Sequence, residues 1–358
     1  MVLYNKNTNY NSIDLAKFVC AILVVMIHVA PFDVAENSGV LFSLNFLFKQ
    51  SICRIAVPLF FVFSGFFLYK KTPLENFSLH HTKAYVTRLF HLYIIWSCIY
   101  FPLYMKNSLE TQTLSDSLIN YIRDFAFSGS YTQLWYLNAL MLAVVIVSFL
   151  LSKKIPPTKI LCISFAFYVV GLLGDGYAGI IAPLYWFPKT AYLLNRYYEI
   201  FDTTRNGLFF AFFFVAVGMI LSNKEKPVIS MKKSLFFFIV SLCALCIETQ
   251  LLKLYGLARD YNVIMFTIPT VLFCFSFLSS LKLKNRKIYK NLRILSSLIF
   301  YLHLLVSYWV WKAIVQLKID IINTPIMFIS TLTLTIALSI AILNISKLRP
   351  FRFLQRLY

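Results

Sequence analysis

Charged residues are scarce in this chain of 358 residues, because Asp, Glu, Lys and Arg together make up only 13% of it. A soluble globular domain carries about 25% charged residues. Hydrophobic residues make up 59% of the chain, and so little polar surface cannot cover a core of that size in water. The same composition excludes a disordered chain, a collagen and a secreted scaffold stapled by disulfides.

Sequence patterns for metal binding and for common cofactor chemistry are also missing. All seven cysteines lie in or beside apolar stretches, including the Cys243 and Cys246 pair. No Cys and His spacing in a loop suggests zinc, so we expect no metal and interpret the cysteines as small packing residues. There is no HExxH, P-loop or GxSxG motif, and the glycines at 171–176 follow no predicted strand. A dinucleotide-binding loop is therefore not expected.

Ten apolar runs are long enough to cross a membrane, which takes about 17–25 residues each. They occupy 13–31, 52–69, 86–105, 134–152, 159–174, 206–222, 234–253, 262–281, 295–316 and 324–346. These runs predict an all-α integral membrane protein, a bundle of about ten transmembrane helices. No polar stretch is long enough for a separate soluble domain, so we expect residues 1–358 to form a single transmembrane domain.

The basic residues predict how the bundle is oriented. Lys and Arg outnumber Asp and Glu by 34 to 14, which gives a formal net charge of +20. If the amino terminus is cytoplasmic, most of them fall in cytoplasmic connections, among them Lys6, Lys224, Lys226 and the stretch 282–293. Cytoplasmic loops carry an excess of Lys and Arg, so this alternation predicts that both termini are cytoplasmic. A lipid bilayer, rather than nucleic acid, is then the partner that accounts for the charge.

The first apolar run contains three ionisable residues, Asp14, Lys17 and His28. Such groups are costly within a membrane and usually face the protein interior. At about 100° per residue all three share one face of a helix, and Asp14 and Lys17 can pair at i,i+3. His28 lies about 16 Å beyond Lys17, in the outer half. It is a candidate proton acceptor because histidine titrates near neutral pH. The alternative is a buried imidazole bonded to a neighbouring helix.

Other polar residues lie at a similar depth in the predicted bundle. Arg54 should meet a carboxylate, backbone carbonyls or a ligand anion, unless its side chain reaches the outer interface. The others are Trp135, Arg205, Asn206, Glu248 and His303. Their similar depth suggests a cavity that water reaches from outside and that binds substrate. Unrelated hydrogen bonds between helices are the alternative.

Five motifs occur in order along the chain, and these are IDLAKFVCAILVVMIHVAPF, RIAVPLFFVFSGFFLYKK, LWYLNALM, TRNGLFFAFFFVAVG and IFYLHLLV. Together they resemble the membrane-bound acyltransferase 3 family over nearly the whole chain. The family's basic residue and His, separated by ten residues, match Lys17 and His28. Its Arg and Gly-aromatic-aromatic pattern matches Arg54 and residues 65–67. The TRNG motif also resembles the membrane part of bacterial serine/alanine racemases.

The resemblance implies a membrane-bound O-acyltransferase of the bacterial inner membrane. It implies cytoplasmic acetyl-CoA as donor, and a hydroxyl of a surface polysaccharide or its lipid-linked precursor as acceptor. His28 then acts as general base or carries the acyl group itself, and Arg54 stabilises the oxyanion. Lys17 and Arg88 are the candidates for binding CoA. The family's Arg-x-x-Arg pair is only half present, since Tyr85 takes the place of the first Arg.

A carrier without chemistry is the alternative function. A ten-helix bundle with charges near its middle can move a small polar solute such as an amino acid or a sugar. The resemblance to racemases keeps amino acids in view. Transporters often have two related halves with paired broken helices, and no such symmetry is evident here. Acyl transfer is therefore the leading expectation.

Overall fold

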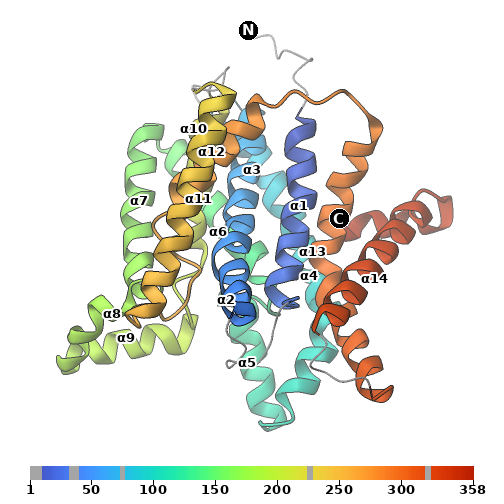
Figure 1. Ribbon diagram of the computed structural model, residues 1–358, viewed down its shortest axis with the longest axis horizontal. Helices are drawn as coiled ribbons and strands as arrows, with labels where there is room; N and C mark the ends of the chain where they lie inside the picture. Colours follow the sequence, from blue (N-terminus) through green and yellow to red (C-terminus); the bar gives the residue numbers. More distant parts are fainter. Residues whose placement is uncertain (1–9, 32–39, 73–76, 224–228, 319–323) are drawn as a thin grey trace.

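The computed structural model describes residues 10–31, 40–72, 77–223, 229–318 and 324–358, and within these ranges it is built of helices without β-strands. Figure 1 shows the long helices running side by side as a bundle. The expectation of an all-α protein is therefore confirmed. Three of the basic residues that predict the orientation, Lys6, Lys224 and Lys226, lie outside the described residues.

Each of the ten expected runs coincides with helical structure. Within the described ranges, the ten helices that match these runs are α1 (Asn11–His28), α3 (Ala56–Lys70), α4 (Leu79–Ser108), α6 (Trp135–Ser152), α7 (Pro157–Gly174), α10 (Phe212–Ser222), α11 (Met231–Leu254), α12 (Thr267–Ser280), α13 (Lys287–Gln316) and α14 (Thr324–Ile345). A further helix, α2 (Val40–Leu47), precedes the second run. In the described part of the chain, eight helical spans are long and apolar enough to cross a membrane. The helical segments Gly207–Ser222 and Thr267–Ser280 are apolar but shorter. An integral membrane protein is therefore supported, while the count of ten, the cytoplasmic termini and the single-domain boundary stay predictions.

The second run, 52–69, lies within a longer helical segment that is irregular at its centre. A π turn, η2 (Phe48–Ile52), and a 3-10 turn, η3 (Cys53–Ile55), join α2 to α3. Together they form an apolar span from Leu44 to Lys70. Arg54 lies in the 3-10 turn. Irregular turns inside helices are frequent at functional sites, because they re-aim side chains.

Small residues bring two central helices into backbone contact. A Cβ added to Gly65 of α3 would overlap the carbonyl of Val215 of α10, and one added to Gly218 would lie 2.7 Å from the backbone nitrogen of Phe66. Small residues permit such close packing between membrane helices. The tight α3–α10 pair fixes the position of η3, and with it Arg54, relative to the rest of the bundle.

The two longest connections, between α4 and α6 and between α7 and η5 (Gly207–Ala211), also form helices. They contain α5 (Leu114–Phe127), α8 (Ala178–Ile181) and α9 (Pro188–Phe201). Figure 1 shows these three helices at the end of the bundle where α1 finishes. The connection between α12 and α13, rich in Lys and Arg, lies at the opposite end, where α1 begins. The chain closes with a 3-10 helix, η6 (Arg349–Leu357), which packs against α4 and α14.

Candidate functional site

A small cavity lies where α1, η3, α6 and α13 meet the segment that precedes η5 (Gly207–Ala211). Its polar and aromatic lining includes His28, Arg54, Gln133, Trp135, Tyr136, Arg205, Asn262 and Phe300. Its volume is about 30 Å³, enough for about one or two water molecules. Four residues selected from the sequence, His28, Arg54, Trp135 and Arg205, thus meet from distant parts of the chain.

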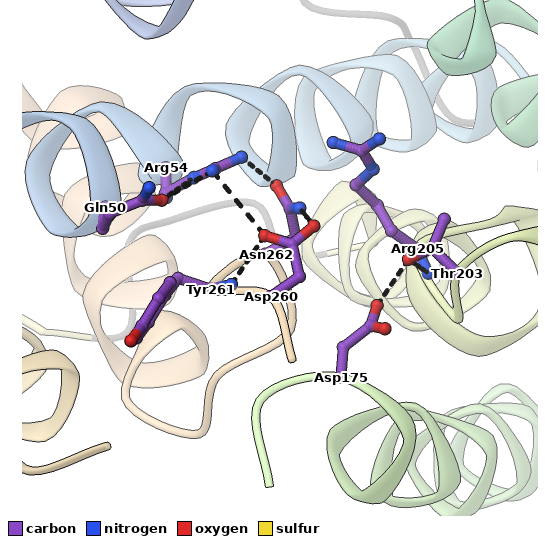
Figure 2. A network of polar contacts seen from close by, with 8 residues as sticks. All are labelled: Gln50, Arg54, Asp175, Thr203, Arg205, Asp260, Tyr261 and Asn262. Atoms are coloured by element: carbon purple, nitrogen blue, oxygen red, sulfur yellow. Dashed lines mark hydrogen bonds and ion pairs between the residues drawn. The ribbon is translucent and has the colours of Figure 1, made fainter. Parts of the chain in front are cut away.

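Arg54 is held by protein groups on several sides (Figure 2). Its Nε and Nη2 donate to Oε1 of Gln50 at 3.1 and 2.6 Å. Its Nη1 donates to Oδ1 of Asn262. The carboxylate of Asp260 lies 3.7 Å from Nη2, and the Arg54 side chain is only 12% exposed. Arg54 therefore meets a carboxylate, and it is fixed in advance, as a group that stabilises an oxyanion must be.

Arg205 has a different environment in the same cavity. Its guanidinium carbon lies 4.5 Å from the centre of the Trp135 ring, a stacking arrangement that favours a cation. Its Nε is buried and has no hydrogen-bond partner in the described part of the chain. Figure 2 correspondingly draws no contact to this guanidinium. A buried donor in a cavity wall that lacks a protein partner is available to a ligand.

The backbone around Arg205 is fixed by a hydrogen-bonded chain that begins after α7. The Arg205 N–H donates to Oγ1 of Thr203 at 3.0 Å, and the Thr203 hydroxyl donates to Asp175 at 2.6 Å. Burial raises the pKa of the Asp175 carboxyl, and the hydrogen bond from Thr203 opposes that rise. This chain supports Arg205 through its backbone and leaves its guanidinium free.

His28 lies at the end of α1, and its ring faces that of His303 on α13. The ring centroids are 5.2 Å apart and the planes are tilted by 37°. His303 is fully buried, and its Nδ1 lies 3.1 Å from the carbonyl oxygen of Ile299. No hydrogen bond joins the His28 ring to any other described residue. Both interpretations of His28, a proton acceptor and an imidazole bonded to a neighbouring helix, stay predictions.

Asn206 has a structural position beside the cavity. Its Oδ1 accepts from the backbone N–H groups of Leu208 and Phe209, both at 3.0 Å, and its Nδ2 donates to the hydroxyl of Tyr197 at 2.9 Å. These bonds make Asn206 the N-cap of η5, a position that asparagine favours. The substrate-binding role expected for Asn206 stays untested.

Glu248 of α11 lies outside the lining of the His28 cavity. Its Oε1 accepts from the N–H of Met265 at 2.8 Å and from the hydroxyl of Tyr177, and its Oε2 accepts from the N–H of Phe266 at 2.8 Å. These amides directly precede α12, which explains why α12 begins only at Thr267 and is shorter than the apolar run. Glu248 also borders an apolar cavity of about 420 Å³. Its expected substrate-binding role stays a prediction, as does that of His303.

The two residues expected to bind CoA lie elsewhere in the structure. The Lys17 ammonium lies over the Phe67 ring, 4.6 Å from its centroid. The ionic partner of Asp14 is Arg293 at 3.8 Å, and the i,i+3 pair between Asp14 and Lys17 is not among the ion pairs of the described residues. The i,i+3 spacing on α1 permits a pair between Asp14 and Lys17, but the Lys17 ammonium instead contacts the aromatic ring of Phe67 on α3.

Arg88 is exposed on α4, and its Nη2 donates to the backbone oxygen of Tyr358 at 3.3 Å. The neighbouring Trp96 donates its Nε1 to the carbonyl of Leu357 at 3.1 Å. The segment that follows α14 therefore covers this part of α4. The CoA-binding roles of Lys17 and Arg88 stay predictions.

Sequence reasoning missed several polar residues of the cavity. Gln133 is 1% exposed; its Nε2 donates to the carbonyl of Tyr301 at 3.4 Å, while its Oε1 is buried without a partner among the described residues. Gln50 and Asn262 position Arg54. The sequence did indicate the contact between Gln50 and Arg54, because residues four apart are neighbours on a helix. Hydropathy treats all three as the edges of apolar runs, which is why they were not selected.

Within the described ranges, no group of three His, Cys, Asp or Glu side chains is placed to hold a metal ion. The chemistry available in the cavity is that of an imidazole beside two guanidinium groups. An imidazole can accept a proton, and a guanidinium can stabilise a developing negative charge.

Comparison with known proteins assigns most of the chain. Residues 10–344 match a family described as an acyltransferase domain. An amino-acid racemase of Enterococcus faecalis is 30% identical over 286 residues, which are 78% of this chain and 37% of that protein. A serine/alanine racemase of Enterococcus gallinarum is 27% identical over 295 residues, 81% of this chain and 40% of that protein. The chain thus spans about two fifths of the length of these relatives. No solved structure matches the chain significantly.

Proposed function

The chain belongs to the acyltransferase domain family, and we propose that it is a membrane-bound O-acyltransferase that moves an acetyl group from cytoplasmic acetyl-CoA to a hydroxyl of a surface polysaccharide or its lipid-linked precursor. A bacterial inner membrane is the proposed location. One observation carries the proposal, namely that His28, Arg54 and Arg205 line a single cavity inside an apolar bundle. Ionisable groups brought together inside a membrane protein are typical of a functional site.

In the proposed reaction, His28 accepts the proton of the acceptor hydroxyl while the hydroxyl oxygen attacks the carbonyl carbon of the thioester. A C–O bond forms and a tetrahedral oxyanion develops, which Arg54 stabilises. The C–S bond then breaks, and the proton held by His28 passes to the departing thiolate, so that the free thiol of CoA and an acetyl ester result. A positioned base contributes about 10²–10⁴-fold to such a step.

The free guanidinium of Arg205 supports a role in holding the acceptor. It is fixed through its stacking on Trp135 and retains a buried donor that a hydroxyl or an anionic group can use. The cavity of about 30 Å³ is far smaller than the roughly 300–1,000 Å³ of typical ligand sites. Binding of a sugar and an acetyl thioester therefore requires the cavity walls to separate, and the proposal includes that opening.

The donor would approach from the end of the bundle that carries the basic connections. Lys17 and Arg88 are the proposed contacts for CoA. Phosphate groups bind well to guanidinium and ammonium groups. Arg88 is exposed, and its Nη2 donates to the backbone oxygen of Tyr358; a phosphate group could replace that partner.

Two measurements test the proposal. Cell-surface glycans from cells with and without the protein are compared for O-acetyl esters, and the protein purified in detergent is assayed for release of CoA thiol from acetyl-CoA. We expect ester loss without the protein and thiol release with it, both abolished in His28→Ala. Thiol release that is unchanged in His28→Ala would exclude the proposed base.

A second candidate function is transport of an amino acid. The similarity to proteins named amino-acid racemase and serine/alanine racemase favours it, and two guanidinium groups in one cavity suit a carboxylate. Uptake of labelled serine and alanine by vesicles that contain the purified protein tests this function. Uptake without any acyl transfer would favour the carrier.

A further inference from the structure

A second histidine contacts the proposed base without lining the cavity. His303 of α13 is 0% exposed, and its ring centroid lies 5.2 Å from that of His28. The residues that line the cavity include His28 but not His303. His303 is therefore placed to act on His28 rather than directly on a substrate.

The hydrogen bonding of His303 determines which of its ring nitrogens carries the proton. Nδ1 lies 3.1 Å from the carbonyl oxygen of Ile299. A carbonyl oxygen can only accept, so Nδ1 must be the donor. In a neutral ring Nε2 then has a lone pair and no proton. That Nε2 is buried and has no hydrogen-bond partner within the described ranges.

A buried acceptor without a partner is unusual, and the His28 ring can supply the missing donor. Rings whose centroids are 5.2 Å apart are close enough for a nitrogen of His28 to lie within about 3 Å of Nε2, the length of a hydrogen bond, when the two nitrogens face each other. The His28 nitrogen that donates to His303 must carry the proton, so the other nitrogen has the free lone pair. That second nitrogen is the one able to accept a proton from a substrate.

We infer that His303 is a positioning residue, which holds His28 in the tautomer and orientation that accept the proton of the acceptor hydroxyl. The inference rests on the proposed role of His28 as base. His303 need not take up a proton itself, and its burial opposes a positive charge on its ring. The neighbouring Phe300 ring, 6.3 Å from His303 between centroids, adds no group that could balance such a charge.

Nitrogen NMR of the intact chain with ¹⁵N-labelled histidine tests the inference without any enzyme assay. The chain has five histidines, so single substitutions can assign each signal. We expect His28 in one neutral tautomer in the wild-type protein and in an exchanging mixture of both in His303→Phe. An unchanged His28 signal in His303→Phe would overturn the inference. This readout stands even if acyl transfer is never observed, so failure of the proposed function is distinguishable.

Kinetics of two conservative variants separate positioning from packing. In His303→Gln the side-chain oxygen can reach the place of Nε2 and accept from His28, whereas the shorter side chain of His303→Asn reaches only the place of Nδ1. We expect His303→Gln to stay near the wild-type kcat and His303→Asn to lose about 10²-fold in kcat, with KM for acetyl-CoA unchanged in both. Size-exclusion profiles confirm folding. Equal losses in the two variants would indicate packing alone, and a raised KM with normal kcat would indicate substrate binding; either result contradicts the inference.

Discussion

Two groups that the sequence marks equally, Glu248 and Arg205, have opposite surroundings in the structure. Glu248 accepts hydrogen bonds from Met265, Phe266 and Tyr177, so both of its carboxylate oxygens have partners. Arg205 keeps a buried Nε without a partner among the described residues, in the wall of the His28 cavity. Burial of an ionisable group inside an apolar bundle therefore does not by itself indicate function. A group saturated by its own fold contributes to stability, whereas an unsaturated one is available for chemistry.

The largest expected effect is the loss of kcat in His28→Ala, at a residue that lines the same cavity as Arg205. Loss of the proposed base should lower kcat by about 10²–10⁴-fold, with only a small fall in the unfolding temperature, because the hydrogen bond inferred from His28 to His303 contributes about 0.5–1.5 kcal/mol. Release of CoA thiol measures the first quantity and thermal unfolding in detergent the second. His91→Ala is the matched control, since His91 is exposed on α4. A near-normal kcat in His28→Ala would remove the basis for treating the cavity as the reactive site.

The next effect tests whether the free guanidinium holds substrate. We expect Arg205→Ala to raise KM for the acceptor by about 10–100-fold, since one hydrogen bond from a charged group contributes about 1.5–3 kcal/mol. Arg205→Lys should recover only part of this, because an ammonium group lacks the flat fork that stacks on Trp135. Arg196→Ala is the control, because that side chain is 59% exposed on α9. If Arg205→Ala instead unfolded the protein without changing KM, the contrast with Glu248 would disappear.

Because both carboxylate oxygens of Glu248 have hydrogen-bond partners, Glu248→Gln should lower the stability of the protein rather than its turnover. The amide nitrogen of glutamine cannot accept a hydrogen bond, so the backbone N–H of Met265 or of Phe266 loses its partner. The expected cost is about 1–3 kcal/mol of unfolding free energy, read as a lower unfolding temperature in detergent. Turnover per folded molecule should remain close to wild type. Glu199→Gln, at a side chain that is 58% exposed, provides the control, and a selective loss of kcat in Glu248→Gln would make Glu248 part of the reactive site.

The smallest expected effect is a loss of stability at Asn206, which is adjacent in sequence to Arg205. Asn206→Ala removes the N-cap of η5 and should cost about 1 kcal/mol. Asn206→Asp keeps an oxygen acceptor for the Leu208 and Phe209 amides and should lose less. Thermal unfolding of the two variants measures this difference. A change in acceptor KM as large as that of Arg205→Ala would instead support the substrate-binding role that the sequence suggested for Asn206.

Much of the fold could be predicted because hydrophobic length is a local property. The runs at 206–222 and 262–281 were located correctly as helices, but α12 begins only at Thr267. The reason is a contact over about 17 residues, the bonds from the Met265 and Phe266 amides to Glu248. A hydropathy window does not register a carboxylate on another helix.

The candidate site could be predicted only in part. The spacing within α1 and the position of Arg54 identified two residues that do line one cavity. Gln133 was missed because a single amide at the end of an apolar run has no periodic signal. The Asp14–Lys17 pair was expected from helix geometry, yet Asp14 pairs with Arg293 of α13, far away in the sequence.

The amino-acid composition and the spacing of apolar residues predict a helical chain that is apolar enough for a membrane, and they identify the few ionisable residues that its helices carry. Each of these properties depends on residue type and on spacing within one helix. Which of those residues share a cavity, and which have all their hydrogen bonds formed, depends on the packing of the helices, because a hydrogen bond requires atoms from separate helices to meet. For that reason the Nε of Arg205 has no hydrogen-bond partner among the described residues, whereas the carboxylate of Glu248 has several.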